Sequence, residues 1–241
     1  MITVNINGKK IQAEEGKAIL EIARDNNIYI PSLCNDDSVT PYGACRLCLV
    51  EIEKGGRSRL VASCLYNVED GLTIKTDTPR VNNVRRMVIE LLLSRCPDSE
   101  VLQKLARKLG VEEVRFQNDT DKGNCILCGL CTRVCQEVVG TSAISMANRG
   151  VNRQMTTPFS VLSDSCIACG SCSYICPTGA ISVEDDADTR TIIMPNVKME
   201  FKLKQCAKCG RYFAPEKQLE FISRKSGVPM SELDCCIDCR D

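Results

Sequence analysis

Two cysteine runs of identical spacing limit what this chain can fold into more than any other feature. Each run reads C-x2-C-x2-C-x3-C, and Pro177 directly follows the second. Three thiolates at this spacing can bind one cubic 4Fe–4S cluster, and the fourth cysteine of each run normally binds the cluster of the other run. The predicted ligands are Cys125, Cys128, Cys131 and Cys176 for one cluster, and Cys166, Cys169, Cys172 and Cys135 for the other.

A pair of zinc sites is the alternative interpretation of these runs. Tetrahedral zinc needs only pairs of C-x2-C, whereas each run supplies three closely spaced cysteines and a fourth. We therefore predict a two-cluster, ferredoxin-like domain over residues 121–195.

The first 78 residues predict a different iron–sulfur domain. Ile2, Val4 and Ile6 alternate before an Asn7-Gly8 turn, which is typical of a β-hairpin, and a helical pattern and further strand patterns follow. This order indicates a β-grasp unit, and its four cysteines predict a 2Fe–2S cluster with a first loop longer than the plant-type spacing. A zinc knuckle is the alternative. The predicted ligands are Cys34, Cys45, Cys48 and Cys64.

Residues 79–120 predict a helical connector between the two cluster domains. Pro79 is expected to open its first helix, and Ser99 to cap its second. Cys96 is expected to be a buried thiol rather than a ligand. The apolar positions expected on the inner side of the helices are Val81, Val84, Val88 and Leu91, widened by Met87 and Leu92, and then Val101, Leu102, Leu105 and Leu109.

Residues 196–241 predict a separate metal-binding tail, with Pro195 marking its boundary. Two C-x2-C knuckles supply four thiolates, which is a closed structural zinc geometry. A further iron–sulfur cluster is the alternative, since four thiolates also hold 2Fe–2S. Cys235 is expected to lie outside the ligand set, and the predicted ligands are Cys206, Cys209, Cys236 and Cys239.

Composition narrows the functional classes. The chain has 18 cysteines among 241 residues, and its N-terminus lacks the pattern of a signal peptide, so we expect metal-bound thiolates in a reducing cytoplasm. The 31 basic and 31 acidic residues balance, which argues against nucleic acid or a lipid surface as a partner, and no apolar run predicts a membrane span. Histidine is absent, which excludes histidine-ligated clusters. The expected fold class is α+β.

Residues 1 to about 183 resemble the N-terminal region of the large iron–sulfur subunit of respiratory NADH dehydrogenase. They are equally similar to the diaphorase iron–sulfur subunit of bidirectional or bifurcating NAD-linked hydrogenases, and the same layout begins the catalytic subunit of multimeric FeFe hydrogenases. The stretches that carry the resemblance are Cys34-x10-Cys45-Arg-Leu-Cys48, Ala62-Ser-Cys64, the two runs at Cys125 and Cys166, and Arg149-Gly150.

Two departures from these families are informative. The families often hold a further cluster in a His-Pro-x-Asp-Cys-x2-Cys-like segment, whereas Ser94-Arg95-Cys96-Pro97-Asp98 has one cysteine and no histidine. That cluster is expected to be missing. The large catalytic domain of FeFe hydrogenases is also expected to be missing. The tail resembles the four-cysteine extension of some ferredoxin-like subunits of formate hydrogenlyase and related hydrogenases.

The resemblance implies an electron-transfer subunit of a multisubunit NAD(P)-linked hydrogenase, with no catalytic residues of its own. Its expected partners are a flavin- and NAD(P)-binding subunit and hydrogenase subunits. The equivalent subunit of an NAD-dependent formate dehydrogenase or of an NADH dehydrogenase complex is the alternative. A redox sensor or scaffold, and a catalytic iron–sulfur enzyme, are alternatives of other classes, but in each cluster all four predicted thiolates are assigned and no iron is left open.

Overall fold

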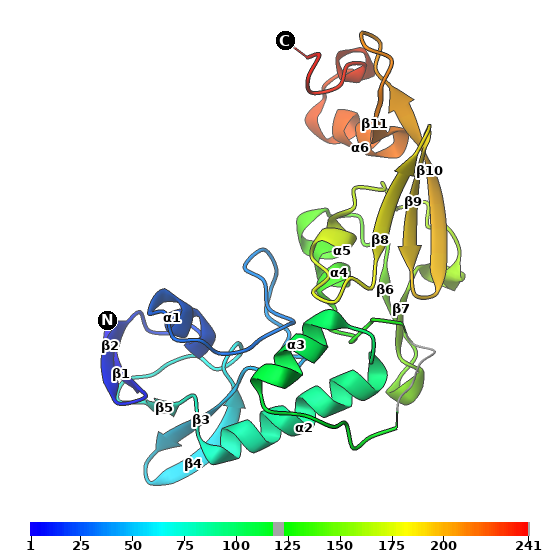
Figure 1. Cartoon of the computed structure of the whole chain (residues 1–241). Helices are drawn as coiled ribbons and strands as arrows, with labels where there is room; N and C mark the ends of the chain where they lie inside the picture. Colours follow the sequence, from blue (N-terminus) through cyan, green and yellow to red (C-terminus); the bar gives the residue numbers. More distant parts are fainter. Residues whose placement is uncertain (118–122, 241) are drawn as a thin grey trace. The chain divides into compact units, whose positions relative to one another are not determined.

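The computed structural model describes residues 1–117 and 123–240, and the chain divides into two compact units, Met1–Gly129 and Leu130–Asp241 (Figure 1). The predicted border between the connector and the two-cluster domain, at residues 120 and 121, lies outside the described residues. In the described part of the chain, no helix combines the length and the apolar character that crossing a membrane would need.

A mixed five-stranded sheet forms the N-terminal part of the first unit. Its strand order is β2-β1-β5-β3-β4, in which β1 and β5 run parallel and the other neighbours run antiparallel. The predicted hairpin turns at Asn7 and Gly8, which both have positive φ. The strands are β1 (Ile2–Ile6), β2 (Lys9–Ala13), β3 (Leu49–Lys54), β4 (Arg57–Ala62) and β5 (Thr73–Lys75).

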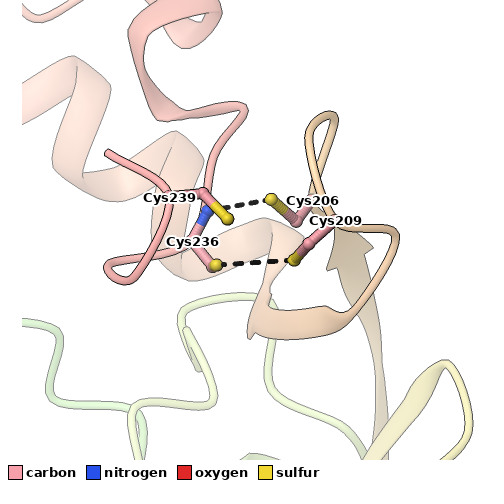
Figure 2. Close-up of side chains that lie close together, drawn as sticks. All are labelled: Cys206, Cys209, Cys236 and Cys239. Atoms are coloured by element: carbon pink, nitrogen blue, oxygen red, sulfur yellow. Dashed lines mark hydrogen bonds between the residues drawn. The ribbon is translucent and has the colours of Figure 1, made fainter. Parts of the chain in front are cut away.

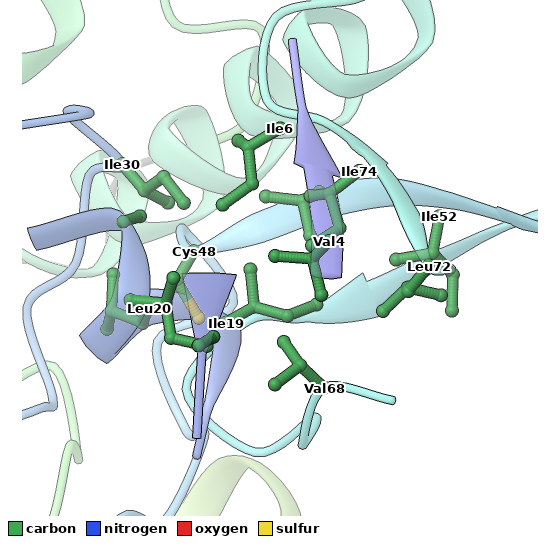
Figure 3. Packing of buried hydrophobic residues seen from close by; sticks show 14 of the residues in the cluster. Val4, Ile6, Ile19, Leu20, Ile30, Cys48, Ile52, Val68, Leu72 and Ile74 are labelled. Carbon is green, nitrogen blue, oxygen red and sulfur yellow. The ribbon is translucent and has the colours of Figure 1, made fainter. Parts of the chain in front are cut away.

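Helix α1 (Ile19–Asp25) covers one face of this sheet and closes an aliphatic core (Figure 3). Ile6 and Ile74 reach the core from the sheet, and Ile19 from the helix, and none of these three side chains is exposed. Cys48, a predicted ligand, is 1% exposed and packs in the same cluster. The core therefore holds one side of the cysteine loop in place.

Helix α2 (Pro79–Arg95) begins as predicted, but its buried face differs from the predicted one. Pro79 stands in the first turn, and the Thr78 side chain accepts a hydrogen bond from the Val81 N–H. The expectation for Leu91 and Met87 was wrong, because both are nearly half exposed. The buried positions are Val81, Arg85, Ile89, Glu90 and Leu93. The buried face of α2 therefore includes an arginine, Arg85, which the search for apolar residues at helical spacing had not identified.

Helix α3 (Glu100–Lys108) follows with Ser99 at the predicted N-cap position. Its hydroxyl makes no capping bond, and it is buried without a hydrogen-bond partner among the described residues. Leu102 and Leu105 are buried as expected, but Val101 is 43% exposed and Ala106 takes its place in the core. The prediction of this helix was therefore correct, whereas the predicted capping bond and one core position were wrong.

The second unit contains a four-stranded antiparallel sheet, a small hairpin and short helical turns. The sheet has the order β11-β10-β9-β8, and β6 pairs with β7 in the hairpin. The strands are β6 (Ser145–Ala147), β7 (Gln154–Thr156), β8 (Ser182–Asp186), β9 (Thr189–Met194), β10 (Val197–Gln205) and β11 (Tyr212–Pro215). The helices are α4 (Leu130–Arg133), a π-helical turn (Val134–Val138), α5 (Ser171–Tyr174) and α6 (Glu216–Ser226), and 3-10 turns span Gly150–Asn152, Pro158–Ser160 and Met230–Leu233.

Strand β10, the first strand of the predicted tail, pairs with β9 of the predicted two-cluster domain. It pairs with β9 from Val197↔Met194 to Lys202↔Thr189, so residues 182–194 and 197–205 share one sheet. Burial alternates along the strand, and Met199 and Phe201 lie in the same core cluster as Cys166. A hairpin turn therefore stands at residues 195 and 196, and the four-domain division stays a prediction.

Replacing Phe201 with alanine is expected to destabilise the second unit by about 3–5 kcal/mol, because it opens a cavity in this shared core. The measurement is anaerobic denaturant unfolding of the holoprotein, followed by loss of cluster absorbance. Lys202→Ala is the matched control, since the Lys202 side chain is exposed and its ion pair with Glu216 spans 3.8 Å at the surface. The control should stay within about 0.5 kcal/mol of wild type. Equal shifts in the two variants would contradict a packing role for β10.

Candidate metal centres

The structure brings the four cysteines of the predicted 2Fe–2S site together in the first unit. The Sγ atoms of Cys48 and Cys64 are 3.4 Å apart, and the Cys45 N–H donates to Cys34 Sγ at 3.3 Å. All four side chains are at most 3% exposed. The Leu33 N–H also donates to Cys45 Sγ at 3.4 Å. The arrangement supplies buried sulfur donors with backbone N–H groups directed at them.

Backbone geometry explains two residues in this loop. Gly43 has φ +70°, which strains residues with a side chain, and a Cβ atom there would lie 2.4 Å from Leu65 Cδ1 and would displace that side chain. Arg46, between Cys45 and Leu47, also has a positive φ, of 58°. A non-glycine residue in this region is strained, and such strain persists only where the surroundings enforce it.

The electrostatics of this site favour one thiolate in particular. The hydrogen bond between the Cys48 and Cys64 sulfurs lowers the pKa of Cys48 to about 6, although burial acts in the opposite direction. The same bond raises the pKa of Cys64, and a hydrogen bond with Cys34 raises that of Cys45. Metal binding requires every thiolate to be deprotonated, so it would release the protons that these pairs share.

Ser63 provides a test of whether a charged sulfur site fits here. Its side chain is fully buried, and its hydroxyl forms no hydrogen bond of ordinary geometry among the described residues. It lies close enough to the Cys48 sulfur to help lower the pKa of that thiol. Its backbone is held on both sides, because Ser63 N–H donates to Cys48 O at 3.1 Å and Ser63 O accepts from Leu20 N–H at 3.0 Å. A buried donor next to Cys64 fits a site that presents additional sulfur acceptors, as a 2Fe–2S cluster does.

The second predicted 4Fe–4S set lies wholly in the second unit. Burial raises the pKa of Cys172 to about 12, and the nearby sulfurs of Cys169, Cys166 and Cys135 act in the same direction. The structure therefore brings all four members of this set together. Arg190, from β9, donates to the Ala168 carbonyl at 3.2 Å, so the sheet anchors the loop that carries Cys166 and Cys169.

The fourth cysteine of each run has the same kind of surroundings. The Ala143 N–H donates to Cys135 Sγ at 3.2 Å, and the Ala180 N–H donates to Cys176 Sγ at the same distance. A threonine hydroxyl also contacts each sulfur, from Thr141 at 3.3 Å and from Thr178 at 3.8 Å. The two runs therefore repeat in structure as well as in spacing.

The first predicted 4Fe–4S set draws residues from both units, Cys125 and Cys128 from the first and Cys131 and Cys176 from the second. The repeat extends to its loop, because Leu127 has φ 54° and the corresponding Ala168 has φ 57°. The assignment of this set as ligands stays a prediction.

Cys96 ends helix α2 and is fully buried. Its N–H donates to the Leu92 carbonyl at 2.9 Å, which continues the hydrogen bonding of the helix. Its place at a helix end fits the predicted packing role.

The four predicted tail cysteines form a compact group whose sulfur atoms all lie within 4.8 Å of one another (Figure 2). Cys206 and Cys209 lie on the turn between β10 and β11, and Cys236 and Cys239 lie on the facing C-terminal loop. Cys209 Sγ and Cys236 Sγ are 3.8 Å apart, and the Cys236 N–H donates to Cys206 Sγ at 3.3 Å. Within the described residues this is a complete set of four sulfur donors for one ion.

Hydrogen bonds prepare this group for a cation. Backbone N–H groups of Cys209 and Cys236 lower the pKa of Cys206 to about 5. Burial raises the pKa of Cys236, but hydrogen bonds from Arg211 and Cys239 outweigh burial and lower it. Hydrogen bonds with Cys209 and Cys236 raise the pKa of Cys239 to about 12. The lowered pKa values of Cys206 and Cys236 favour the thiolate form that metal binding requires.

Three residues near these sites were missed by the sequence analysis: Arg85, Ser63 and Arg211. Arg85 could have been found, because Val81, Arg85, Ile89 and Leu93 follow one another at intervals of four and so share a helix face. Ser63 and Arg211 carry no comparable pattern, since each acts through a turn that only the folded chain brings into place.

Comparison with protein families gives the class of these centres. Residues 1–79 match the family described as a 2Fe-2S iron-sulfur cluster binding domain, and residues 124–180 match the 4Fe-4S dicluster domain. The chain thus places a 2Fe–2S domain in front of a 4Fe–4S dicluster domain and adds a C-terminal group of four cysteines.

Individual relatives show which kinds of protein contain chains similar to this one. The chain is 34% identical to a subunit of the NADP-reducing hydrogenase of Solidesulfovibrio fructosivorans over 75% of its own length. It is 31% identical to a subunit of the NADH-quinone oxidoreductase of Rickettsia conorii over 95% of its length. It spans only 36% of either relative.

A solved structure agrees. A chain of an NAD+-reducing NiFe hydrogenase in the H2-reduced state superposes with a TM-score of 0.64 at 27% identity, covering 74% of this chain and 85% of that one. The chain is an iron–sulfur protein that resembles the N-terminal region of the large NADH dehydrogenase subunit and the corresponding subunit of NAD-linked hydrogenases.

Substituting serine for Cys96 is expected to leave the iron content of the anaerobically purified chain unchanged, because Cys96 is predicted to be a packing residue. Cys128→Ser is the positive control and should reduce iron or broaden the cluster EPR signals. Iron analysis and EPR of both variants check the prediction. A loss of about four irons in Cys96→Ser would show that the connector holds a cluster.

Neighbouring cysteines in the tail should behave differently. Cys236→Ser is expected to release the tail metal, because Cys236 Sγ lies inside the group of four sulfurs, whereas Cys235→Ser is expected to retain it. Metal analysis of the two full-length variants, each after dialysis against a mild chelator, gives the comparison. Metal loss only in Cys235→Ser would mean that the ligand set is wrong.

Proposed function

We propose that this chain is an electron-transfer subunit of a multisubunit NAD(P)-linked hydrogenase, positioned between a flavin- and NAD(P)-binding module and a hydrogenase module. The observation that carries the proposal is the presence of two iron–sulfur family domains in one chain that is similar, over about three quarters of its length, to chains of NAD(P)-linked hydrogenases. The clusters, when bound, would accept and release single electrons.

The chain's own residues hold the clusters and control their surroundings. Cys34, Cys45, Cys48 and Cys64 would bind 2Fe–2S, and the two crossed sets of the cysteine runs would bind 4Fe–4S. Eight of these twelve cysteines are buried and four are half-buried, which limits water around the sulfurs. The N–H donors at Leu33, Ala143 and Ala180 stabilise negative charge on the sulfurs that they contact. All four ligands of each site are cysteine, which leaves no iron position open for substrate, so catalysis would belong to partner subunits.

Two observations favour a hydrogenase over the alternatives. The relative named as part of an NADP-reducing hydrogenase is 34% identical, and the solved NAD+-reducing hydrogenase chain is covered over 85% of its length. The equivalent subunit of an NADH dehydrogenase or NAD-dependent formate dehydrogenase is the second candidate, and the relative from an NADH-quinone oxidoreductase favours it. The flavin-binding partner and the cytoplasmic location belong to both candidates as predictions.

The tail group supports zinc as its metal. Zinc–sulfur bonds of about 2.3 Å in a tetrahedron separate the sulfurs by about 3.8 Å. The distance between the Cys209 and Cys236 sulfurs is 3.8 Å, and all four sulfurs fit within 4.8 Å. Two irons bridged by sulfide would hold ligands of different irons farther apart. The compact geometry suits one ion and favours zinc over an additional cluster.

Anaerobic reconstitution of the full chain is expected to give about ten iron atoms in the three clusters, with one zinc in the tail. EPR after dithionite should show 2Fe–2S and 4Fe–4S signals, and the isolated chain should not reduce a dye from NADH. After addition of the flavin-binding partner, NADH should reduce the clusters.

Three results would contradict parts of this proposal separately. Iron near two or four, without a 4Fe–4S signal, would contradict the cluster assignment. NADH oxidation by the isolated chain above contamination would contradict the absence of a catalytic site. Purification of the native complex together with quinone-reducing subunits, and without hydrogenase subunits, would favour the NADH dehydrogenase alternative.

A further inference from the structure

Arg85 lies beneath the ligand loop of the predicted 2Fe–2S site. Its side chain extends from helix α2 and is 4% exposed. Its three nitrogens donate to carbonyls on both sides of the loop: Nε to Leu47 O at 3.1 Å, Nη2 to Leu49 O at 2.6 Å and Nη1 to Thr76 O at 3.0 Å. Leu47 and Leu49 flank Cys48, so the guanidinium clamps the backbone on either side of a ligand.

In the described part of the chain, no carboxylate lies within ion-pair distance of the Arg85 guanidinium. Among the described residues Arg85 forms no ion pair, whereas the exposed Arg80 on the same helix pairs with Glu51. Arginine stays protonated inside proteins, and a buried charge that is not paired is strongly unfavourable. Burial lowers the pKa of Arg85, and negative charge at Asp77 and Cys48 counteracts that shift. The carbonyl oxygens offset part of the cost, but they do not neutralise the charge.

We propose that the predicted 2Fe–2S site is the counter-charge of Arg85, and that Arg85 is a positioning residue that raises the reduction potential of this site. The inference rests on the proposed function only in requiring that a 2Fe–2S cluster binds these four cysteines. Four thiolates around this cluster carry net negative charge. A fixed cation held against the backbone of Cys48 is therefore attracted to the loaded site in either redox state.

The direction of the effect follows from charge alone. Reduction adds one electron, no proton moves and no bond breaks, so the site becomes more negative by one charge. Coulomb attraction to a buried cation increases with that charge and is weakly screened where water is excluded. Arg85 thus stabilises the reduced state more than the oxidised state. Loss of its charge makes the cluster harder to reduce.

The test compares midpoint potentials of the 2Fe–2S EPR signal in the full-length, anaerobically reconstituted chain. Arg85→Gln removes the charge and keeps an amide donor, and Arg85→Lys keeps the charge. Arg86→Gln is the matched control, because Arg86 stands next on the same helix but is exposed and bonds to Leu109 O at 2.9 Å. The 4Fe–4S signals of each sample serve as an internal reference.

The expected result is a lower 2Fe–2S potential in Arg85→Gln, a potential near wild type in Arg85→Lys, and no shift in Arg86→Gln or in the 4Fe–4S signals. An unchanged potential in iron-replete Arg85→Gln, or an equal shift in Arg86→Gln, would overturn the inference. Should Arg85→Gln lose the cluster, Arg85→Lys decides: a retained cluster at near wild-type potential supports the role of charge, and a lost cluster or a lowered potential refutes it. A wild-type chain without 2Fe–2S would instead contradict the proposed function, and the inference with it.

Discussion

Both units depend on sulfur atoms converging where they can share a metal. Thiolates repel one another, so four of them come together only where a metal and hydrogen-bond donors offset the repulsion. The chain supplies backbone donors: the N–H groups of Leu33, Ala143 and Cys236 point at Cys45, Cys135 and Cys206 over 3.2 to 3.4 Å. The direction of an N–H group is fixed by the backbone. The loops must therefore adopt the conformation that directs these N–H groups at the sulfur atoms.

That requirement accounts for the strained residues beside the cysteines. Arg46, Leu127 and Ala168 have φ of 58°, 54° and 57°, a region that costs a residue with a side chain about 1–2 kcal/mol. Each stands inside a C-x2-C pair, where the chain must turn sharply between two ligands. Metal binding can offset this cost, since its free energy adds to that of folding. We infer that the loops keep this shape because the loaded site stabilises it.

Residue spacing in the sequence therefore predicted the features that turn and metal-ligand chemistry determine. It did not predict the features that tertiary packing determines. The hairpin at Asn7, the start of α2 at Pro79 and the grouping of the tail cysteines follow from turn chemistry and ligand spacing. The buried face of α2 could not be predicted in this way. Hydrophobicity favours Leu91 over Arg85 as a buried residue, but in the folded chain backbone carbonyls accept hydrogen bonds from Arg85, whereas Leu91 is exposed to water. Ser99 stands at its cap position without its capping bond for a similar reason: burial, rather than local geometry, determines its surroundings.

Strand β10 joins the predicted tail to the sheet of the second unit, so the tail is not packed as a separate module. Pro195 predicted a domain boundary, but the pairing of β10 with β9 and the burial of Met199 and Phe201 cannot be predicted from a local sequence pattern. The turn that carries Cys206 and Cys209 begins where β10 ends, so the second unit's sheet fixes one knuckle directly. The other knuckle, at Cys236 and Cys239, returns to it after α6. One metal ion bound by both knuckles would crosslink the two ends of the segment between them. Structural metals stabilise segments that are too small for a hydrophobic core of their own in this way. Closure of this kind needs no change of oxidation state, which supports the proposal of zinc in the tail.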